Sequence, residues 1–158
     1  MNIMVAYYSW QGHTRQVAEM LAEKLDAQLV VIEAVKESSV PVEALKAFFG
    51  MKSDIKSCKT DLKEVDHLLL ATPVWARHSP AYLNKYISLL SNTSGKSYSV
   101  MAEMRSKGAD ITIEQIQKKM AKKQMKLLIT GITLEKEVNS GEFEKTVSKM
   151  VEYLKENI

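Results

Sequence analysis

Hydrophobic residues gather in five short runs along the chain, and each run gives way to a segment whose apolar residues have helical spacing. The runs themselves show no helical period, which is typical of strands that are buried on both faces in a parallel sheet. We therefore predict five buried strands, at residues 2–8, 29–32, 66–72, 97–102 and 127–132.

The segments between the runs predict five amphipathic helices. The first begins at Thr14, and its apolar residues fall on one face. Thr112, followed three residues later by Gln115, predicts a capping box at the start of the fourth. The remaining boundaries place the later helices at residues 41–51, 80–90, 112–123 and 140–156.

The alternation of strand and helix, without repeats or long linkers, predicts an α/β fold in a single domain over residues 1–158. Crossover helices cover both faces of a parallel sheet, so the expected architecture is three-layered and doubly wound around five parallel strands. Ligands of such sheets bind beyond the carboxyl ends of the strands. The loops that follow Tyr8, Thr72 and Ala102 are therefore the candidate site.

The loop after the first strand runs directly into a helix and reads Ser9, Trp10, Gln11, Gly12, His13 and Thr14. A helix start offers unpaired N–H groups and the positive end of the helix dipole, which together favour an anion. Gly12 lets the backbone approach that anion closely. No Gly-Lys-Ser/Thr and no three-glycine spacing follows, which weighs against a nucleoside triphosphate and against resident NAD. Taken alone, the loop fits an ordinary turn and helix cap equally well.

The loop after the third strand places a tryptophan at the same end of the sheet, in the run Thr72, Pro73, Val74, Trp75 and Ala76. A flat heteroaromatic ring needs a stacking surface, which Trp75 would supply, while the backbone of this run meets the polar edge of the ring. The alternative is that Trp75 fills the core beneath the loop, since tryptophan is mostly buried.

The pairing of residues 7–15 (YYSWQGHTR) with residues 71–75 (ATPVW) resembles the flavodoxin family, and the order and length of the elements extend the likeness over the whole chain. The resemblance implies a flavodoxin-like sheet of order 2-1-3-4-5 and FMN as cofactor. It implies that Ser9, Gln11, Gly12, His13 and Thr14 hold the phosphate and that residues 72–76, with Trp75, lie along the isoalloxazine ring. The few residues between the fifth strand and the last helix leave no room for the insertion of the larger flavodoxins, so the chain resembles the short type.

The loop after the fourth strand, residues 102–108, departs from the family pattern because it lacks the usual tyrosine or paired glycines. Met104 is expected to pack on the ring edge as a flexible thioether. Glu103 would disfavour a reduced, anionic flavin unless it points away. In the loop after the third strand, residues 73–79, called here the ring-side loop, Arg77 and His78 provide positive charge. A cation there favours the anionic reduced form and a phosphate-bearing reductant. The alternative is that Arg77 simply faces water.

Composition and charge narrow the partners and the cellular location that we expect for the protein. Of the 158 residues, 46% are hydrophobic, the net charge is +3 and the pI is near 8.8, values that argue for neither nucleic-acid nor membrane binding. The single cysteine, Cys58, excludes an internal disulfide and a cysteine-based metal cluster. With no signal peptide or spanning segment recognised, we expect a cytoplasmic protein. Five lysines between positions 118 and 126 form either a solvated helix face or a docking patch for an acidic partner.

Three functions are compatible with these features. The chain is an electron carrier, an FMN-dependent oxidoreductase with NAD(P)H as the candidate reductant, or a flavodoxin-fold binding or regulatory module with weak or no FMN binding. The partner is accordingly a redox protein or a small-molecule acceptor. No residue is an obvious catalytic acid, base or nucleophile, which suits redox chemistry because the cofactor carries the reaction.

Overall fold

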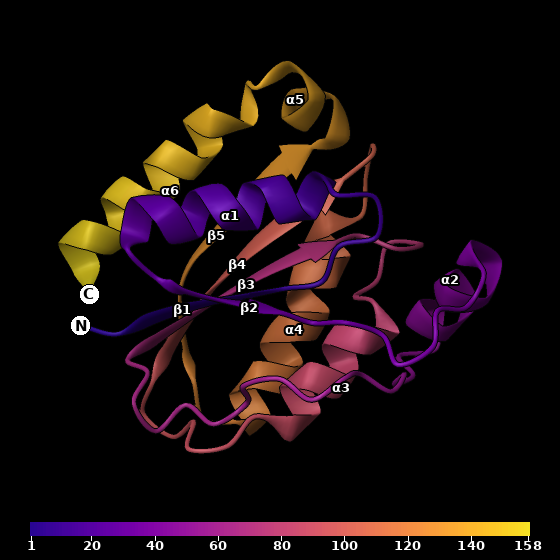
Figure 1. Ribbon diagram of the computed structural model, residues 1–158, viewed down its shortest axis with the longest axis horizontal. Coiled ribbons are helices and arrows are strands. Elements are labelled where there is room, and N and C mark those ends of the chain that lie inside the picture. Colours follow the sequence, from indigo (N-terminus) through magenta and orange to yellow (C-terminus); the bar gives the residue numbers. More distant parts are fainter.

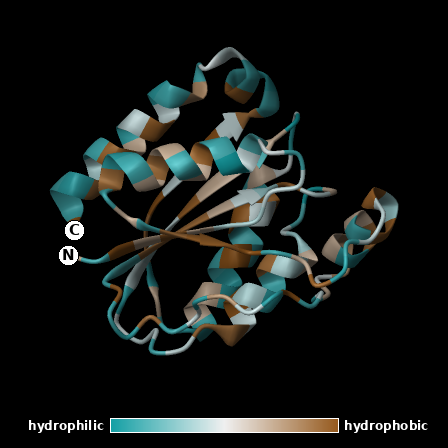
Figure 2. Ribbon diagram, in the orientation of Figure 1, coloured by the Kyte–Doolittle hydropathy of each residue, from teal (hydrophilic) through white to brown (hydrophobic).

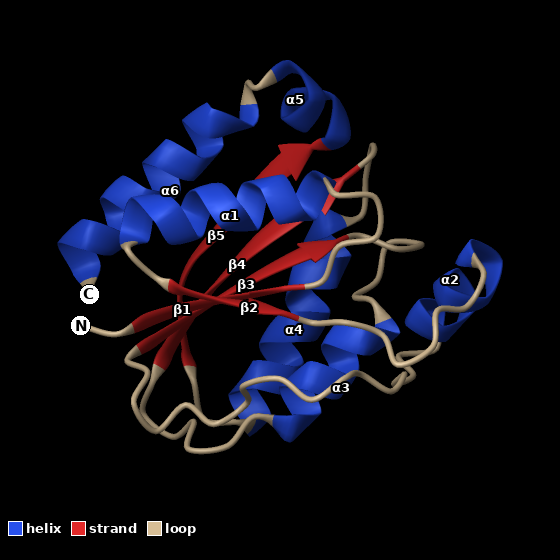
Figure 3. Ribbon diagram, in the orientation of Figure 1, coloured by secondary structure: helices blue, strands red, loops and turns tan.

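The computed structural model describes residues 1–158 and forms one five-stranded parallel sheet with helices on both faces (Figures 1 and 3). The strand order β2-β1-β3-β4-β5 confirms the predicted topology. The strands are β1 (Ile3–Tyr7), β2 (Gln28–Val31), β3 (His67–Pro73), β4 (Ser97–Met104) and β5 (Lys126–Leu134). The helices are α1 (His13–Leu25), α2 (Val40–Phe48), α3 (Ala81–Leu89), α4 (Ala109–Lys122), α5 (Glu135–Ser140) and α6 (Phe143–Asn157).

Two hydrophobic clusters, one on each face of the sheet, hold the three layers together. One cluster lies between the sheet and α3 and α4, and the other joins the sheet to α1 and α6 (Figure 1). Every residue of β3, the central strand, is buried, which explains its continuous apolar run. Figure 2 shows the same pattern, with hydrophobic residues concentrated in the strands. No helix of the chain combines the length and the apolar character that crossing a bilayer requires.

The prediction of a capping box at Thr112 is wrong. Helix α4 begins at Ala109, after Gly108, whose φ of 102° is left-handed. Thr112 therefore lies inside the helix and is fully buried. The side-chain oxygen of Gln115 instead accepts a hydrogen bond from the backbone N–H of Ser79, at 3.3 Å. Glycine at this position starts the helix one turn earlier than the polar pattern indicated.

The segment after β5 also differs from the prediction. The strands β4 and β5 each continue two residues beyond the predicted ends, and the short helix α5 follows β5 without a loop. The sequence pattern did not predict α5 because its six residues are polar except for Val138, the one residue that it buries. Its start is stabilised by Glu137, whose carboxylate accepts from the backbone N–H of Leu134 at 2.8 Å. This helix brings Glu135 to the carboxyl edge of the sheet.

Candidate functional site

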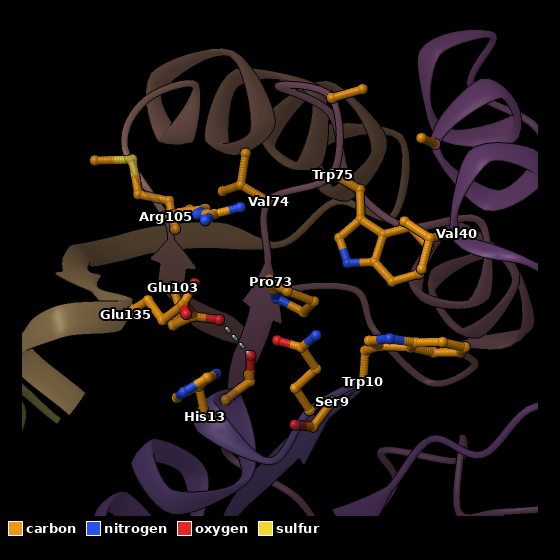
Figure 4. A pocket seen from close by; sticks show the side chains of 15 residues that line it. Ser9, Trp10, His13, Val40, Pro73, Val74, Trp75, Glu103, Arg105 and Glu135 are labelled. Carbon is orange, nitrogen blue, oxygen red and sulfur yellow. Dashed lines mark hydrogen bonds between the residues drawn. The ribbon is translucent and has the colours of Figure 1, made fainter. Parts of the chain in front are cut away.

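A cavity of about 390 Å³ opens at the carboxyl edge of the sheet, where the loops after β1, β3 and β4 converge (Figure 4). This volume lies in the range of small-molecule sites. The three loops meet because their strands are neighbours in the sheet. Ten of the twelve predicted site residues line the cavity: Ser9, Trp10, Gln11, His13, Thr14, Pro73, Val74, Trp75, Ala76 and Met104.

Gly12 and Thr72, the other two predicted site residues, do not line the cavity. Gly12 immediately precedes α1 with a φ of 93°, a left-handed conformation that glycine adopts without strain. Thr72 is fully buried, and its hydroxyl donates to the carbonyl of Pro73 at 3.0 Å. In this structure both residues shape their loops and do not form the cavity surface.

The start of α1 presents unpaired donors at the cavity. Ser9 Oγ accepts from the backbone N–H groups of Gly12, at 3.1 Å, and Arg15, at 3.2 Å, and so fixes the turn. No acceptor within the chain pairs with three further N–H groups of this loop, those of Gln11, His13 and Thr14. All three residues line the cavity, so the arrangement suits an anion at the positive end of the helix dipole.

Aromatic residues form another wall of the cavity. Trp10 and Trp75 stand edge to face, with ring centroids 5.7 Å apart and an interplanar angle of 85° (Figure 4). Trp75 also packs on the core cluster between the sheet and α3, with its ring 6.1 Å from that of Tyr8. It is therefore a cavity residue that rests on the core. Val40 and Ala44 of α2 line the cavity as well, a contribution that no sequence pattern indicated.

The ring-side loop ends in a strained two-residue turn. Trp75 and His78 exchange backbone hydrogen bonds of 2.9 and 2.8 Å across Ala76 and Arg77, which have φ values of 47° and 66°. Left-handed conformations are unfavourable for residues other than glycine and cluster at functional loops. Arg77 does not line the cavity, since it packs on the backbone of Gly108.

The cation that lines the cavity is Arg105, from the loop after β4. The sequence placed positive charge in the ring-side loop, whereas the structure brings it from the next strand. Figure 4 shows Arg105 close to Val74 and on the same side of the cavity as Glu103.

Two carboxylates also face the cavity. Glu103 exposes 7% of its surface and accepts a hydrogen bond from the Thr14 hydroxyl at 3.2 Å. Burial raises the pKa of Glu103, the Thr14 hydrogen bond and His13 lower it, and Glu135 raises it. A ring nitrogen of His13 and one carboxylate oxygen each of Glu103 and Glu135 lie within 4.8 Å of one another (Figure 4). Glu103 thus does not point away from the site. Its place in the sequence, near the carboxyl end of a strand, was the feature that indicated its position at the cavity.

Comparison with solved structures supports the fold. A flavoprotein from Lactobacillus acidophilus NCFM in complex with FMN superposes with a TM-score of 0.72 at 16% identity, covering 88% of this chain and 97% of that one. Oxidised flavodoxin 2 from Bacillus cereus gives 0.66 at 16% identity over the full length of both chains. An azoreductase from Bacillus anthracis gives 0.56 at 12% identity over 96% of both.

Comparison of the sequence itself gives the family. No curated protein sequence matches the chain. Residues 1–128, however, match the profile of the family described as NADPH-dependent FMN reductase. This stretch contains the first four strands of the sheet and the three loops that converge on the cavity. The chain therefore belongs to the NADPH-dependent FMN reductase family and is a flavodoxin-like, FMN-binding flavoprotein.

Proposed function

We propose that the chain binds FMN in the cavity at the carboxyl edge of the sheet and acts as an oxidoreductase that passes reducing equivalents from NAD(P)H to a small acceptor. The observation that carries this proposal is one cavity with two kinds of wall. The start of α1 offers free N–H donors, and the indole rings of Trp10 and Trp75 offer aromatic surface. A ring-bearing phosphate matches both walls at once.

The first loop fits the phosphate of FMN. The N–H groups of Gln11, His13 and Thr14 have no acceptor in the chain, and the dipole of α1 adds favourable potential for an anion. Gln11, His13 and Thr14, whose side chains carry an amide, an imidazole and a hydroxyl, all line the cavity. We assign these residues, with Ser9, Trp10 and Gly12 fixing the loop, to the phosphate.

The second and third loops fit the isoalloxazine ring. Trp75 offers stacking surface, and Pro73, Val74 and Ala76 line the cavity beside it, following the buried Thr72. Met104 also lines the cavity, and we assign it to the edge of the ring. Bound FMN supplies the redox chemistry, and these residues bind and orient it.

The family profile favours an enzyme over a dedicated carrier, because its description names NADPH as the reductant. The charge of the cavity does not decide between the two. Arg105 would stabilise an anionic reduced ring, whereas the carboxylates of Glu103 and Glu135 line the same cavity and oppose this effect. The electron carrier is the second candidate, because flavodoxin 2 from Bacillus cereus has the same fold.

The decisive test combines flavin binding with turnover. The purified chain is incubated with FMN, gel-filtered and scanned for the visible absorption of bound flavin, and NADH or NADPH oxidation is then followed with a quinone as acceptor. We expect bound FMN and multiple turnovers. If NADH and NADPH reduce the bound flavin no faster than they reduce free FMN, the chain is an electron carrier. No flavin binding at micromolar concentration would leave a binding or regulatory module.

A further inference from the structure

The buried carboxyl group of Glu103 contacts the Thr14 hydroxyl in the first turn of α1. The Thr14 hydroxyl has a single proton, and in this structure it donates that proton to Glu103 Oε2 at 3.2 Å. Thr14 and Glu103 expose 2% and 7% of their surface, so water screens this contact poorly. While Glu103 is ionised, Thr14 cannot give the same proton to a phosphate.

A phosphate at the start of α1 would also be repelled by Glu103. A phosphate oxygen within hydrogen-bond reach of Thr14 Oγ1 lies within roughly 6 Å of the Glu103 carboxylate. FMN above neutral pH carries a doubly charged phosphate. Burying an ionised carboxylate beside it, with no cation between them, is costly.

No ion pair neutralises Glu103. From α1, His13 faces it and, like the Thr14 hydrogen bond, lowers the pKa of Glu103, but His13 Nε2 lies 3.0 Å from Asn139 Oδ1. From α5, Glu135 faces it and adds negative charge. Arg105 lines the same cavity and forms no ion pair with either carboxylate. Burial, the largest influence, already raises the pKa of Glu103.

We propose that Glu103 is protonated when the FMN phosphate occupies the Ser9–Thr14 loop, so that the chain takes up one proton with each FMN that it binds at pH 7 and above. The inference rests on the proposed phosphate position. The proton resides on Glu103 Oε2 and is donated to Thr14 Oγ1. The direction of the existing hydrogen bond is thereby reversed, and the Thr14 proton becomes free for a phosphate oxygen. Glu103 is thus a positioning residue that makes cofactor affinity depend on pH.

Calorimetric titration of the chain with FMN tests this directly. Titrations at pH 7.5 in buffers of different ionisation enthalpy give the number of protons taken up, and we expect about one per FMN. Between pH 6.5 and 8.5 the Kd should rise by up to about tenfold per pH unit. Riboflavin, which lacks the phosphate, should bind without proton uptake and without this pH dependence.

Variants assign the proton to a residue. Glu103→Gln offers an amide N–H that donates to Thr14 Oγ1, as the protonated carboxyl would, but it cannot titrate. We therefore expect proton uptake near zero, a flat pH profile and a Kd at pH 8 at least about tenfold lower than that of the unmodified chain. Glu135→Gln is the matched control at the rim of the cavity and should retain uptake of about one proton. Uptake that is unchanged in Glu103→Gln would overturn the assignment.

The remaining outcomes separate this inference from the proposed function. FMN that binds tightly with no proton uptake and a flat pH profile in the unmodified chain overturns the inference and leaves the function standing. Binding that requires added Mg²⁺ and is abolished by EDTA also overturns it, because a cation then relieves the repulsion. Failure of both FMN and riboflavin to bind at any pH overturns the proposed function itself.

Discussion

The indole rings of Trp10 and Trp75 stand edge to face with centroids 5.7 Å apart, although they come from loops that follow two different strands. The contact exists because β1 and β3 are neighbours in the sheet and deliver both loops to one edge. It positions each ring against the other and keeps both at the cavity wall. The structure thereby converts two isolated aromatic residues of the sequence into one surface.

Replacement of Trp75 by leucine should weaken flavin binding. Loss of aromatic stacking is worth about 1.4 kcal/mol, so the Kd for FMN should rise about tenfold. Riboflavin should be affected equally because the ring, not the phosphate, loses its contact. Fluorescence quenching of each flavin measures the change. Phe49→Leu, at an exposed aromatic residue outside the cavity, is the control, and an equal loss in that variant would contradict the role of Trp75.

Two glycines with left-handed φ should respond differently to alanine. At Gly12 an added Cβ has no atom within 4 Å, so Gly12→Ala should lower the free energy of unfolding only by the backbone strain, about 1–2 kcal/mol. At Gly108 the added Cβ would lie 2.7 Å from Arg77 Cα, so Gly108→Ala should cost more, because two loops must separate. Urea denaturation compares the two. Equal losses would show that the contact between Arg77 and Gly108 is easily relieved.

Burial of His67 should make stability depend on pH. Its side chain is fully buried on β3 beside Ser97 Oγ, at 2.8 Å, and burial lowers the pKa of His67 to about 4. The unfolded chain, with a histidine pKa of about 6.5, therefore binds more protons between pH 6.5 and 4. Stability should fall as the pH drops through this window, by about 3 kcal/mol in total from this group.

Urea denaturation at pH 7 and pH 5 measures the effect of His67. His67→Gln retains a polar side chain that does not titrate, so its stability should change less between the two pH values than that of the unmodified chain. An identical decrease in both proteins would assign the acid sensitivity to other groups. The difference between the two proteins is the informative quantity, since carboxyl groups titrate in the same range.

The lysines near the end of α4 should divide into structural and exposed members. Lys123 Nζ donates to the carbonyls of Ser88 and Leu90, at 3.0 and 2.8 Å, at the end of α3. Lys123→Met should therefore lower the free energy of unfolding by about 1.5 kcal/mol. Lys122→Met, at an exposed neighbouring position, should change it by less than about 0.5 kcal/mol. Thermal denaturation compares the stabilities of the two variants. Equal effects would contradict the proposal that Lys123 stabilises the end of α3 through these carbonyls.

These lysines also show a limit of pattern-based prediction. One helix face could hold both Lys118 and Lys126 only if the helix continued to residue 126, but α4 ends at Lys122 and Lys126 begins β5. Lys118 pairs with Glu114 at 2.6 Å, while Lys119 and Lys123 are half-buried against the α3 side. The five lysines therefore do not form one uniform helix face, either as a solvated surface or as a docking patch.

The sequence by itself determined the fold and most of the cavity. Continuous apolar runs alternating with amphipathic segments leave few alternatives to a parallel sheet covered on both faces, because such strands must be buried twice. Right-handed crossovers then bring the loops after β1, β3 and β4 to one edge. Ten of the twelve predicted residues line the cavity for this reason.

Only the tertiary structure decided the electrostatics of the site. The contact between Thr14 and Glu103 joins residues 89 positions apart, and Glu135 reaches them on a helix that has no apolar period. Whether a charged side chain points into a cavity depends on the twist of its strand and on what packs beside it, and neither leaves a local pattern. The position of the strand end is encoded along the chain, whereas the direction and pairing of its charges arise only when distant elements pack together.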